Sequence, residues 1–192
     1  MTARRRVASA LALALALIGI AQLGAAGSIH VRAWIAQRLI AASWQVARAQ
    51  GSAPRPWPGA DVRAVARMQV PARGVDLYVL EEASARALAY GPAHVSGTAL
   101  PAHAGNAVVV AHRDTHFAFL RNVHIDDAIE VEGANGAAAQ YRVREVGVLE
   151  QHETRVLDAT DASQLTLITC WPFDAVQPGT PLRFVVIARR VA

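Results

Sequence analysis

The feature that most constrains the fold is a series of strand-sized segments, separated by turn residues, that fills the chain from Asp61 to its end. Each segment either alternates apolar and polar residues or is a short apolar run, as is typical of β-strands. One alanine-rich stretch, Glu81–Tyr90, has acids in its first turn and predicts a short helix. Roughly seven or eight strands with one or two short helices predict a mostly β domain, closed as a mainly antiparallel barrel. The predicted strands are Val62–Val70, Val75–Leu80, Ala107–Ala111, Ala128–Glu132, Gln140–Val148, Leu165–Cys170 and Leu182–Arg189.

The amino terminus carries a membrane signal. Arg4-Arg5-Arg6 precede an uncharged apolar run from Val7 to Gly27. At about 1.5 Å per residue, this run is long enough to cross a hydrocarbon core about 30 Å thick. The arginines predict that the amino terminus stays in the cytoplasm and that the rest of the chain is exported. We interpret residues 1–27 as a basic tip and a transmembrane anchor. A cleaved signal peptide is the alternative, because the small residues in Leu23–Gly27 suit cleavage.

Residues 28–60 combine an amphipathic helix with a proline-rich linker. Between Ser28 and Gln50, apolar residues and tryptophans alternate with arginines and glutamines. Such a helix suits a membrane interface with anionic head groups, and it equally suits packing on its own domain. The sequence pattern is compatible with both locations of the helix. Three prolines in Gly51–Gly59 predict a boundary before a domain at residues 61–192.

Positive charge is concentrated before the predicted domain. Lysine is absent, so all 19 basic side chains are arginine. Residues 1–60 carry seven of them and no acid, which leaves 12 arginines against 15 acids in residues 61–192. The domain is thus slightly acidic, and we expect no nucleic-acid partner. The single cysteine excludes an internal disulfide and a site of several thiolates around zinc. We expect neither a metal nor a cofactor.

The single cysteine, Cys170, ends the predicted strand Leu165–Cys170, directly before the turn signal Trp171-Pro172. Strand alternation places Cys170 on one face together with Thr166 and Ile168. An arbitrary lone cysteine is most often a small buried apolar residue. A nucleophilic thiol needs a base or electropositive surroundings, and acyl transfer needs donors for a developing oxyanion.

Two further polar residues stand at strand ends. His112 follows the apolar strand Ala107–Ala111, and Arg183 lies near the start of the last strand. Alternation groups Arg183 with Val185 and Ile187, where a charge is costly unless it is paired or lines a cleft. Taken alone, each could be an ordinary strand-end or surface residue. Together with an exported thiol they predict an acyl-transfer site.

These residues lie in segments that resemble the sortase family. Leu165–Cys170 resembles the family's Thr-Leu-x-Thr-Cys signature, and Arg183 follows at the spacing of the family's arginine. The segment around His112 is similar to the one that carries the family's histidine, with Ala111 where glycine is usual. The resemblance covers residues 70–192 and is strongest to the single-copy sortases of Gram-negative bacteria, the marine proteobacterial type. Further similar segments are Asp126–Ile129, His94–Pro101 and Trp171-Pro172-Phe173.

The resemblance implies an eight-stranded sortase barrel and a cysteine transpeptidase. Cys170 would form a thioester with the substrate, Arg183 would stabilise the oxyanion or hold the substrate backbone, and His112 would transfer protons. Thr169 and Trp171 would contact the substrate. Family members cleave a C-terminal sorting signal such as Leu-Pro-x-Thr-Gly and pass the acyl group to an amine. The expected partners are therefore an exported substrate protein, an amine acceptor and the inner membrane, with the catalytic domain in the periplasm.

Three other interpretations remain open from the residues alone. His112 and His116 have a zinc-like spacing, although His112 ends a strand and no glutamate follows it as in a hydrolytic motif. A cysteine hydrolase would use the same three residues and release its product to water. A non-catalytic, membrane-anchored binding module would simply bury Cys170.

Overall fold

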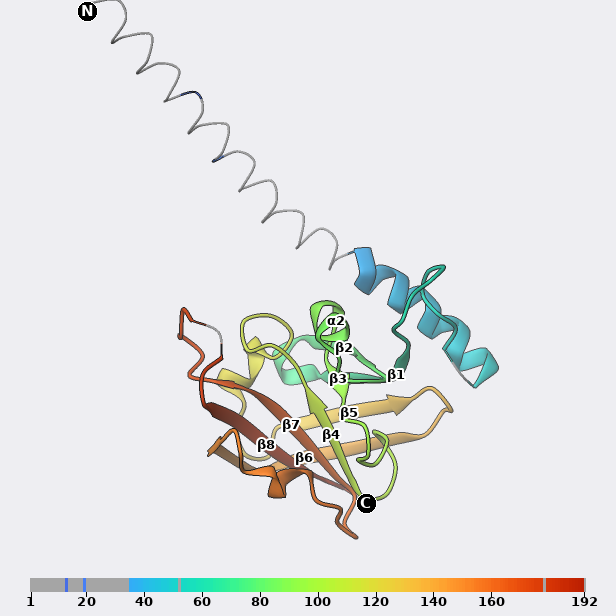
Figure 1. Cartoon of the computed structure of the whole chain (residues 1–192). Helices are drawn as coiled ribbons and strands as arrows, with labels where there is room; N and C mark the ends of the chain where they lie inside the picture. The colour runs from blue at the N-terminus through green and yellow to red at the C-terminus, as the bar shows by residue number, and fades with distance from the viewer. Residues whose placement is uncertain (1–12, 14–18, 20–34, 52, 178, 192) are drawn as a thin grey trace, which may run out of the picture. The chain divides into compact units, whose positions relative to one another are not determined.

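The computed structural model describes residues 13, 19, 35–51, 53–177 and 179–191 (Figure 1). The chain divides after Ala36, and the fold described below is that of the second unit, Gln37–Ala192. The predicted anchor falls outside the described residues, except for two isolated positions. Among the residues that are described, no helix is both long and apolar enough to cross a membrane.

Eight strands close into a barrel in the order β1-β2-β3-β4-β7-β8-β6-β5 (Figure 1). Most neighbouring pairs are antiparallel, whereas β2–β3 and β4–β7 are parallel. The prediction of a mostly β, mainly antiparallel barrel is confirmed. The strands are β1 (Ala64–Val70), β2 (Val75–Leu80), β3 (Ala93–His94), β4 (Asn106–Val110), β5 (Ala128–Gly133), β6 (Ala138–Glu150), β7 (Gln164–Trp171) and β8 (Leu182–Arg190). The short helices are η1 (Pro71–Arg73), α2 (Ala85–Tyr90), η2 (Ala118–Asn122) and η3 (Thr154–Leu157).

Two elements differ from the sequence prediction for local reasons. The strand β3 is only two residues long, too short for a period-2 pattern to be visible. The helix α2 begins at Ala85 and not at Glu81, because the Ser84 hydroxyl caps it by accepting a hydrogen bond from the Ala87 backbone N–H at 3.1 Å. Glu81 instead continues the strand pairing, since its N–H donates to the carbonyl of Arg63 at 2.8 Å.

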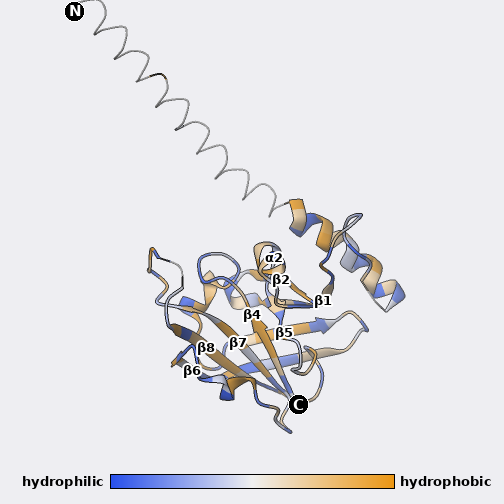
Figure 2. Ribbon diagram, viewed as in Figure 1, coloured by the Kyte–Doolittle hydropathy of each residue, from blue (hydrophilic) through white to orange (hydrophobic). Residues whose placement is uncertain are grey.

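The strand β7 is buried on both faces. Its Leu165 and Leu167 pack in the barrel core, whereas Ile168 packs outside the barrel in a small cluster with Val108 and Val185. The residues Val156 and Leu157 of η3 cover that outer cluster. Apolar colour runs along β4 and β7 in Figure 2, in keeping with strands that are covered on both sides.

The helix over residues 35–50 packs on the barrel through its second half. Ile40, Trp44 and Ala47 are fully buried, at a spacing that places them on one helix face. They join a cluster with residues of β1, β2 and α2, and the Trp44 ring lies 5.9 Å from the ring of Tyr78. Of the two possibilities left open by the sequence, packing on its own domain therefore accounts for this face. Ala53 and Ala60 belong to the same cluster, so the proline-rich segment is also packed.

Candidate active site

Cys170 and Arg183 lie directly opposite each other on the antiparallel strands β7 and β8. Residues paired in this way point to the same face of a sheet, with Cβ atoms roughly 4.5–5.5 Å apart. Cys170 is a free, half-buried thiol. The pairing thus brings the predicted nucleophile and the predicted cation together on the outer face of the barrel.

His112 joins them through the parallel pairing of β4 with β7. Val110 is the partner of Ile168, and the Ala111 N–H continues the ladder by donating to the Ile168 carbonyl at 3.3 Å. His112 and Cys170 each follow this pair by two residues, His112 just past the end of β4 and Cys170 within β7. His112 is exposed. The strands β4, β7 and β8 are neighbours in the barrel, so the segment that follows β4 and carries His112 begins beside the strand of Cys170.

The Arg183 guanidinium is held by uncharged acceptors. Its Nη1 donates to the carbonyls of Thr180 at 2.6 Å and Leu182 at 2.9 Å, and its Nη2 donates to Oε1 of Gln151 at 3.2 Å. A guanidinium carries five N–H donors, so the Nε hydrogen and one Nη2 hydrogen remain for a ligand. None of the ion pairs between described residues involves Arg183. Its positive charge is therefore available to a developing anion.

His116 lies near His112 in the segment that follows β4. Burial lowers the pKa of His116, and the positive charge of His112 lowers it further. His116 is thus harder to protonate than a free histidine, and it stands near the predicted proton-transfer residue.

A groove of about 130 Å³ runs along the outer face that carries Arg183. Its floor is formed by Ile168 and Val185. Ile168 precedes Cys170 by two residues on β7, and Val185 follows Arg183 by two residues on β8, so each pair shares one strand face. Its wall is formed by β6 and by η3. The remaining lining residues are Leu149, Glu150, Gln151, Glu153, Thr154, Val156 and Leu157. Cys170 does not line the groove, but its cross-strand partner Arg183 does, so the groove lies beside the thiol.

Thr169 and Trp171 point to the other face of β7. Thr169 is 2% exposed, and its hydroxyl donates to the Ala111 carbonyl at 2.8 Å. The Trp171 ring stacks on Phe184 at 5.6 Å and meets Phe173 edge-on at 5.5 Å. Alternation therefore separates both residues from the face of Cys170, and each has a structural partner within the protein, while the expected substrate contact of both stays a prediction.

Arg113 is a residue of this region to which the sequence pattern assigned no role. It is 8% exposed, and its guanidinium donates to the carbonyls of Ala175 at 2.7 Å and Gln177 at 2.9 Å. It also donates to the Thr180 hydroxyl at 3.1 Å. Arginine is ordinarily a surface residue, so the sequence did not predict that Arg113 is buried. Its position directly after His112 was the one feature that could have drawn attention to it.

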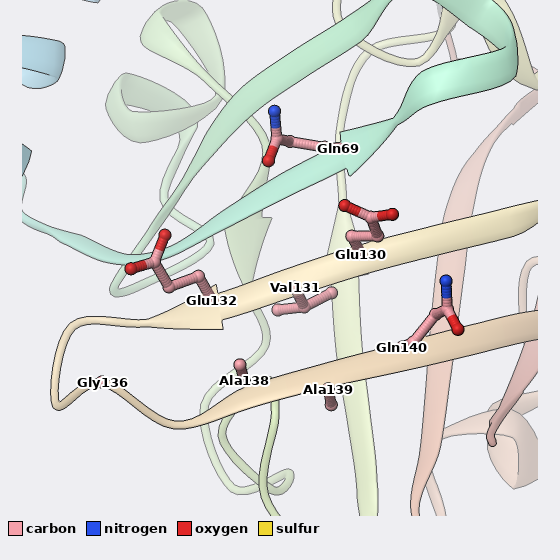
Figure 3. Close-up of a pocket in the computed structure, with 8 residues that line it drawn as sticks. All are labelled: Gln69, Glu130, Val131, Glu132, Gly136, Ala138, Ala139 and Gln140. Carbon is pink, nitrogen blue, oxygen red and sulfur yellow. The ribbon is translucent and has the colours of Figure 1, made fainter. Parts of the chain in front are cut away.

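A second hollow lies elsewhere on the barrel and has different chemistry (Figure 3). Gln69, Glu130 and Gln140 form a row across β1, β5 and β6, because Glu130 pairs with both of the others. Carboxylates and amides line it without a thiol or an imidazole, so it offers no nucleophile for acyl transfer. In the described part of the chain, no three His, Cys, Asp or Glu side chains are grouped as a metal site.

The chain is similar to known proteins in sequence. A family model for the sortase domain matches residues 68–191. Sortase D of Bacillus subtilis (strain 168) is 24% identical over 125 residues, which are 65% of this chain. The matched region spans 62% of that relative's length.

Solved structures share the fold. A lid mutant of sortase A from Corynebacterium diphtheriae superposes with a TM-score of 0.61 and 26% identity, over 70% of this chain and 74% of that chain. Sortase C-1 from Actinomyces oris gives a TM-score of 0.60 and 28% identity, over 69% and 75% of the two chains. Another structure of sortase A from Corynebacterium diphtheriae covers 89% of this chain and 95% of that chain, with a TM-score of 0.62 and 22% identity.

Proposed function

This chain belongs to the sortase family, whose members are cysteine transpeptidases, and we propose that it is an exported, membrane-anchored transpeptidase. Its substrate would be the C-terminal sorting signal, similar to Leu-Pro-x-Thr-Gly, of another exported protein. The acyl group would pass through a thioester on Cys170 to an amine. The observation that carries this proposal is the cross-strand pairing of Cys170 with Arg183, with His112 just past the end of the neighbouring strand β4.

In the first step the Cys170 thiolate attacks the carbonyl carbon of the scissile peptide bond and forms a tetrahedral oxyanion. Arg183 stabilises this oxyanion with the two N–H donors that are not bonded to the protein. The C–N bond then breaks, the leaving amine takes a proton from His112, and the acyl group remains on sulfur as a thioester.

In the second step an amine attacks the thioester carbonyl. His112 takes the proton that the incoming amine loses, a new amide bond forms, and the Cys170 thiolate leaves. Lysine is absent from this chain, so no side chain of this protein offers the acceptor amine. The uncharged acceptors around Arg183 support its role, because they orient the guanidinium without neutralising it.

The groove beside Arg183 would hold the part of the signal that precedes the scissile bond. Its floor of Ile168 and Val185 and its wall of Val156 and Leu157 are apolar, which suits residues such as the Leu-Pro of the signal. A peptide in this groove would lie along β7 with its carbonyl close to Cys170. We propose positioning roles for Thr169 and Trp171 in place of substrate contact, since one holds the Ala111 carbonyl and the other stacks on Phe184.

The test is to measure thioester formation and transfer with labelled sorting-signal peptides and an amine acceptor. We expect Cys170→Ala to abolish both, and Arg183→Ala to slow thioester formation by about 100- to 1,000-fold, as for the loss of an oxyanion donor. Arg189→Ala is the matched control, because Arg189 lies on the same strand at its far end and forms an exposed ion pair with Glu145 at 3.6 Å. It should react normally.

Normal product from Cys170→Ala or Arg183→Ala would refute the assigned roles, provided that circular dichroism shows folded barrels. The product also identifies the reaction type. Transfer to the added amine indicates a transpeptidase, whereas release of a free acid at saturating amine would indicate a hydrolase.

A further inference from the structure

The β7–β8 connection is held to the segment after β4 by a buried arginine. Arg113 reaches three oxygen atoms of this connection, on Ala175, Gln177 and Thr180. No carboxylate forms an ion pair with it among the described residues. A buried guanidinium without a counter-charge is costly and persists only where its hydrogen bonds are satisfied. This cost indicates that Arg113 has a role that a smaller apolar residue could not fill.

Thr180 connects Arg113 to Arg183. Its hydroxyl accepts from Nη1 of Arg113 at 3.1 Å, and its backbone carbonyl accepts from Nη1 of Arg183 at 2.6 Å. The connection is also held from its other side, because the Gln151 N–H donates to the Pro181 carbonyl at 2.7 Å and Gln151 Oε1 accepts from Arg183. The direction of the Arg183 guanidinium therefore depends on where Thr180 lies, and Arg113 holds Thr180.

We propose that Arg113 is a positioning residue that fixes Arg183 beside Cys170 through Thr180. The role rests on the proposed function, in which Arg183 stabilises the oxyanion. Because Arg113 directly follows His112, one short segment both carries the proton-transfer residue and sets the position of the oxyanion donor. A loss of this contact leaves the substrate groove intact and misdirects Arg183, so it lowers the rate of thioester formation more than it changes KM.

The first experiment measures single-turnover thioester formation by Arg113→Met, which keeps an unbranched apolar stem and removes the guanidinium donors. We expect a fall of about 10- to 100-fold in rate, as for a small misplacement of a catalytic group, with KM within about 3-fold. Arg121→Met is the matched control. Arg121 also reaches the β7–β8 connection, through the Phe173 carbonyl at 3.3 Å, but it makes no contact with Thr180. It should retain the normal rate.

Thr180→Val keeps the inference testable if Arg113→Met does not fold. It removes only the hydroxyl acceptor, and we expect a fall of about 2- to 10-fold. Combined with Arg183→Ala, neither Arg113→Met nor Thr180→Val should slow the reaction further, because both act through Arg183. Fully additive losses in these double variants would overturn the proposal and leave Arg113 with a purely structural role.

A measurement without substrate separates this inference from the proposed function. The Nε–H signal of Arg183 in ¹⁵N-arginine-labelled protein should shift or broaden in Arg113→Met and not in Arg121→Met. Hydrogen exchange of the backbone amides of residues 173–177, 179 and 180 should become faster in the same variant. An unchanged Arg183 signal would overturn the inference even if the wild-type protein is an active transpeptidase. A wild-type protein that forms no thioester while these signals do shift would instead overturn the proposed function.

Discussion

Cys170 and Thr169 are adjacent residues that face opposite sides of β7, and their surroundings differ accordingly. The Cys170 side chain is half-buried opposite Arg183, on the face that continues into the groove. The Thr169 hydroxyl holds the Ala111 carbonyl inside the barrel wall at 2.8 Å. Since Ala111 precedes His112, this bond links the strand of the proposed nucleophile to the segment that carries the proposed proton-transfer residue. Two neighbouring residues of β7 thus face different surroundings, Cys170 the groove side and Thr169 the interior of the barrel wall.

The lowered pKa of His116 makes the free energy of unfolding depend on pH. Burial and the nearby His112 lower its pKa in the folded protein, whereas an unfolded histidine has its ordinary pKa of about 6.5. The unfolded state therefore binds the proton more readily. The contribution of the neutral His116 to the free energy of unfolding should be complete above the ordinary pKa. It should be lost as the pH decreases from that value towards the lower pKa of the folded protein. Chemical denaturation between about pH 8 and pH 5 measures this fall.

His116→Gln should have a flatter stability profile over the same pH range, because the group that takes up a proton on unfolding is gone. His152→Gln provides the control, since His152 is an exposed residue of the turn after β6. Its profile should follow that of the wild-type protein. Equal slopes for wild type and His116→Gln would contradict the assigned role of His116 burial.

At the scale of elements, β7 is the strand on which the site depends. Leu165 and Leu167 pack inside the barrel, and Ile168 packs outside it under η3. A strand covered on both faces and paired along both edges, with β4 and β8, has little freedom to move. Cys170 lies near the end of this rigid strand, where its side chain becomes accessible.

The packed half of the helix over residues 35–50 predicts a large effect on stability. Trp44 is fully buried and contacts the Tyr78 ring, so Trp44→Ala should reduce the free energy of unfolding by about 3–5 kcal/mol. Val46→Ala, on the exposed side of the same helix, should cost well under 1 kcal/mol. Thermal or urea unfolding of a chain shortened to begin at residue 37 measures both.

The same helix tests where the folded domain begins. A chain that begins at residue 61 lacks Ile40, Trp44 and Ala47, and it should unfold at a clearly lower temperature than one that begins at residue 37. Equal unfolding temperatures for the two chains, or an unchanged stability of Trp44→Ala, would show that the helix adds no stability to the barrel.

At the scale of the whole molecule, charge and hydropathy predict its placement in the cell. The first 60 residues carry seven arginines and no acid, and an apolar run follows the first three of them. We expect the full chain to remain in the inner membrane after alkaline carbonate extraction, with its catalytic domain in the periplasm. Amino-terminal sequencing of that fraction should find the anchor retained, whereas a chain that begins at residue 37 should be soluble when expressed.

A mature amino terminus near Ser28 would contradict the retained anchor and indicate a cleaved signal peptide. A chain that begins at residue 37 and still resists carbonate extraction would show instead that the described domain carries a membrane-binding surface of its own.

Much of the fold could be predicted from local patterns. The prediction for β2 was Val75–Leu80, as observed, because a turn before it and two acidic residues directly after it mark both ends of an alternating segment. The two faces of β7 and β8 were also predicted, since Leu167 and Val186 lie in the core and Ile168 and Val185 lie outside it. The strand β3 and the start of α2 were missed, because the first depends on a neighbouring strand and the second on one cap.

The sequence by itself determined which residues are candidates for chemistry. A period of two residues follows from the geometry of an extended chain, so it groups Cys170 with Ile168, and Arg183 with Val185, whatever their neighbours are. Only the tertiary structure decided that β4, β7 and β8 are adjacent and that Cys170 faces Arg183. Pairing between distant strands depends on the closure of the whole barrel, which no local pattern encodes. The same closure buries Thr169, and it places Arg113 against Thr180, 67 residues away in the chain.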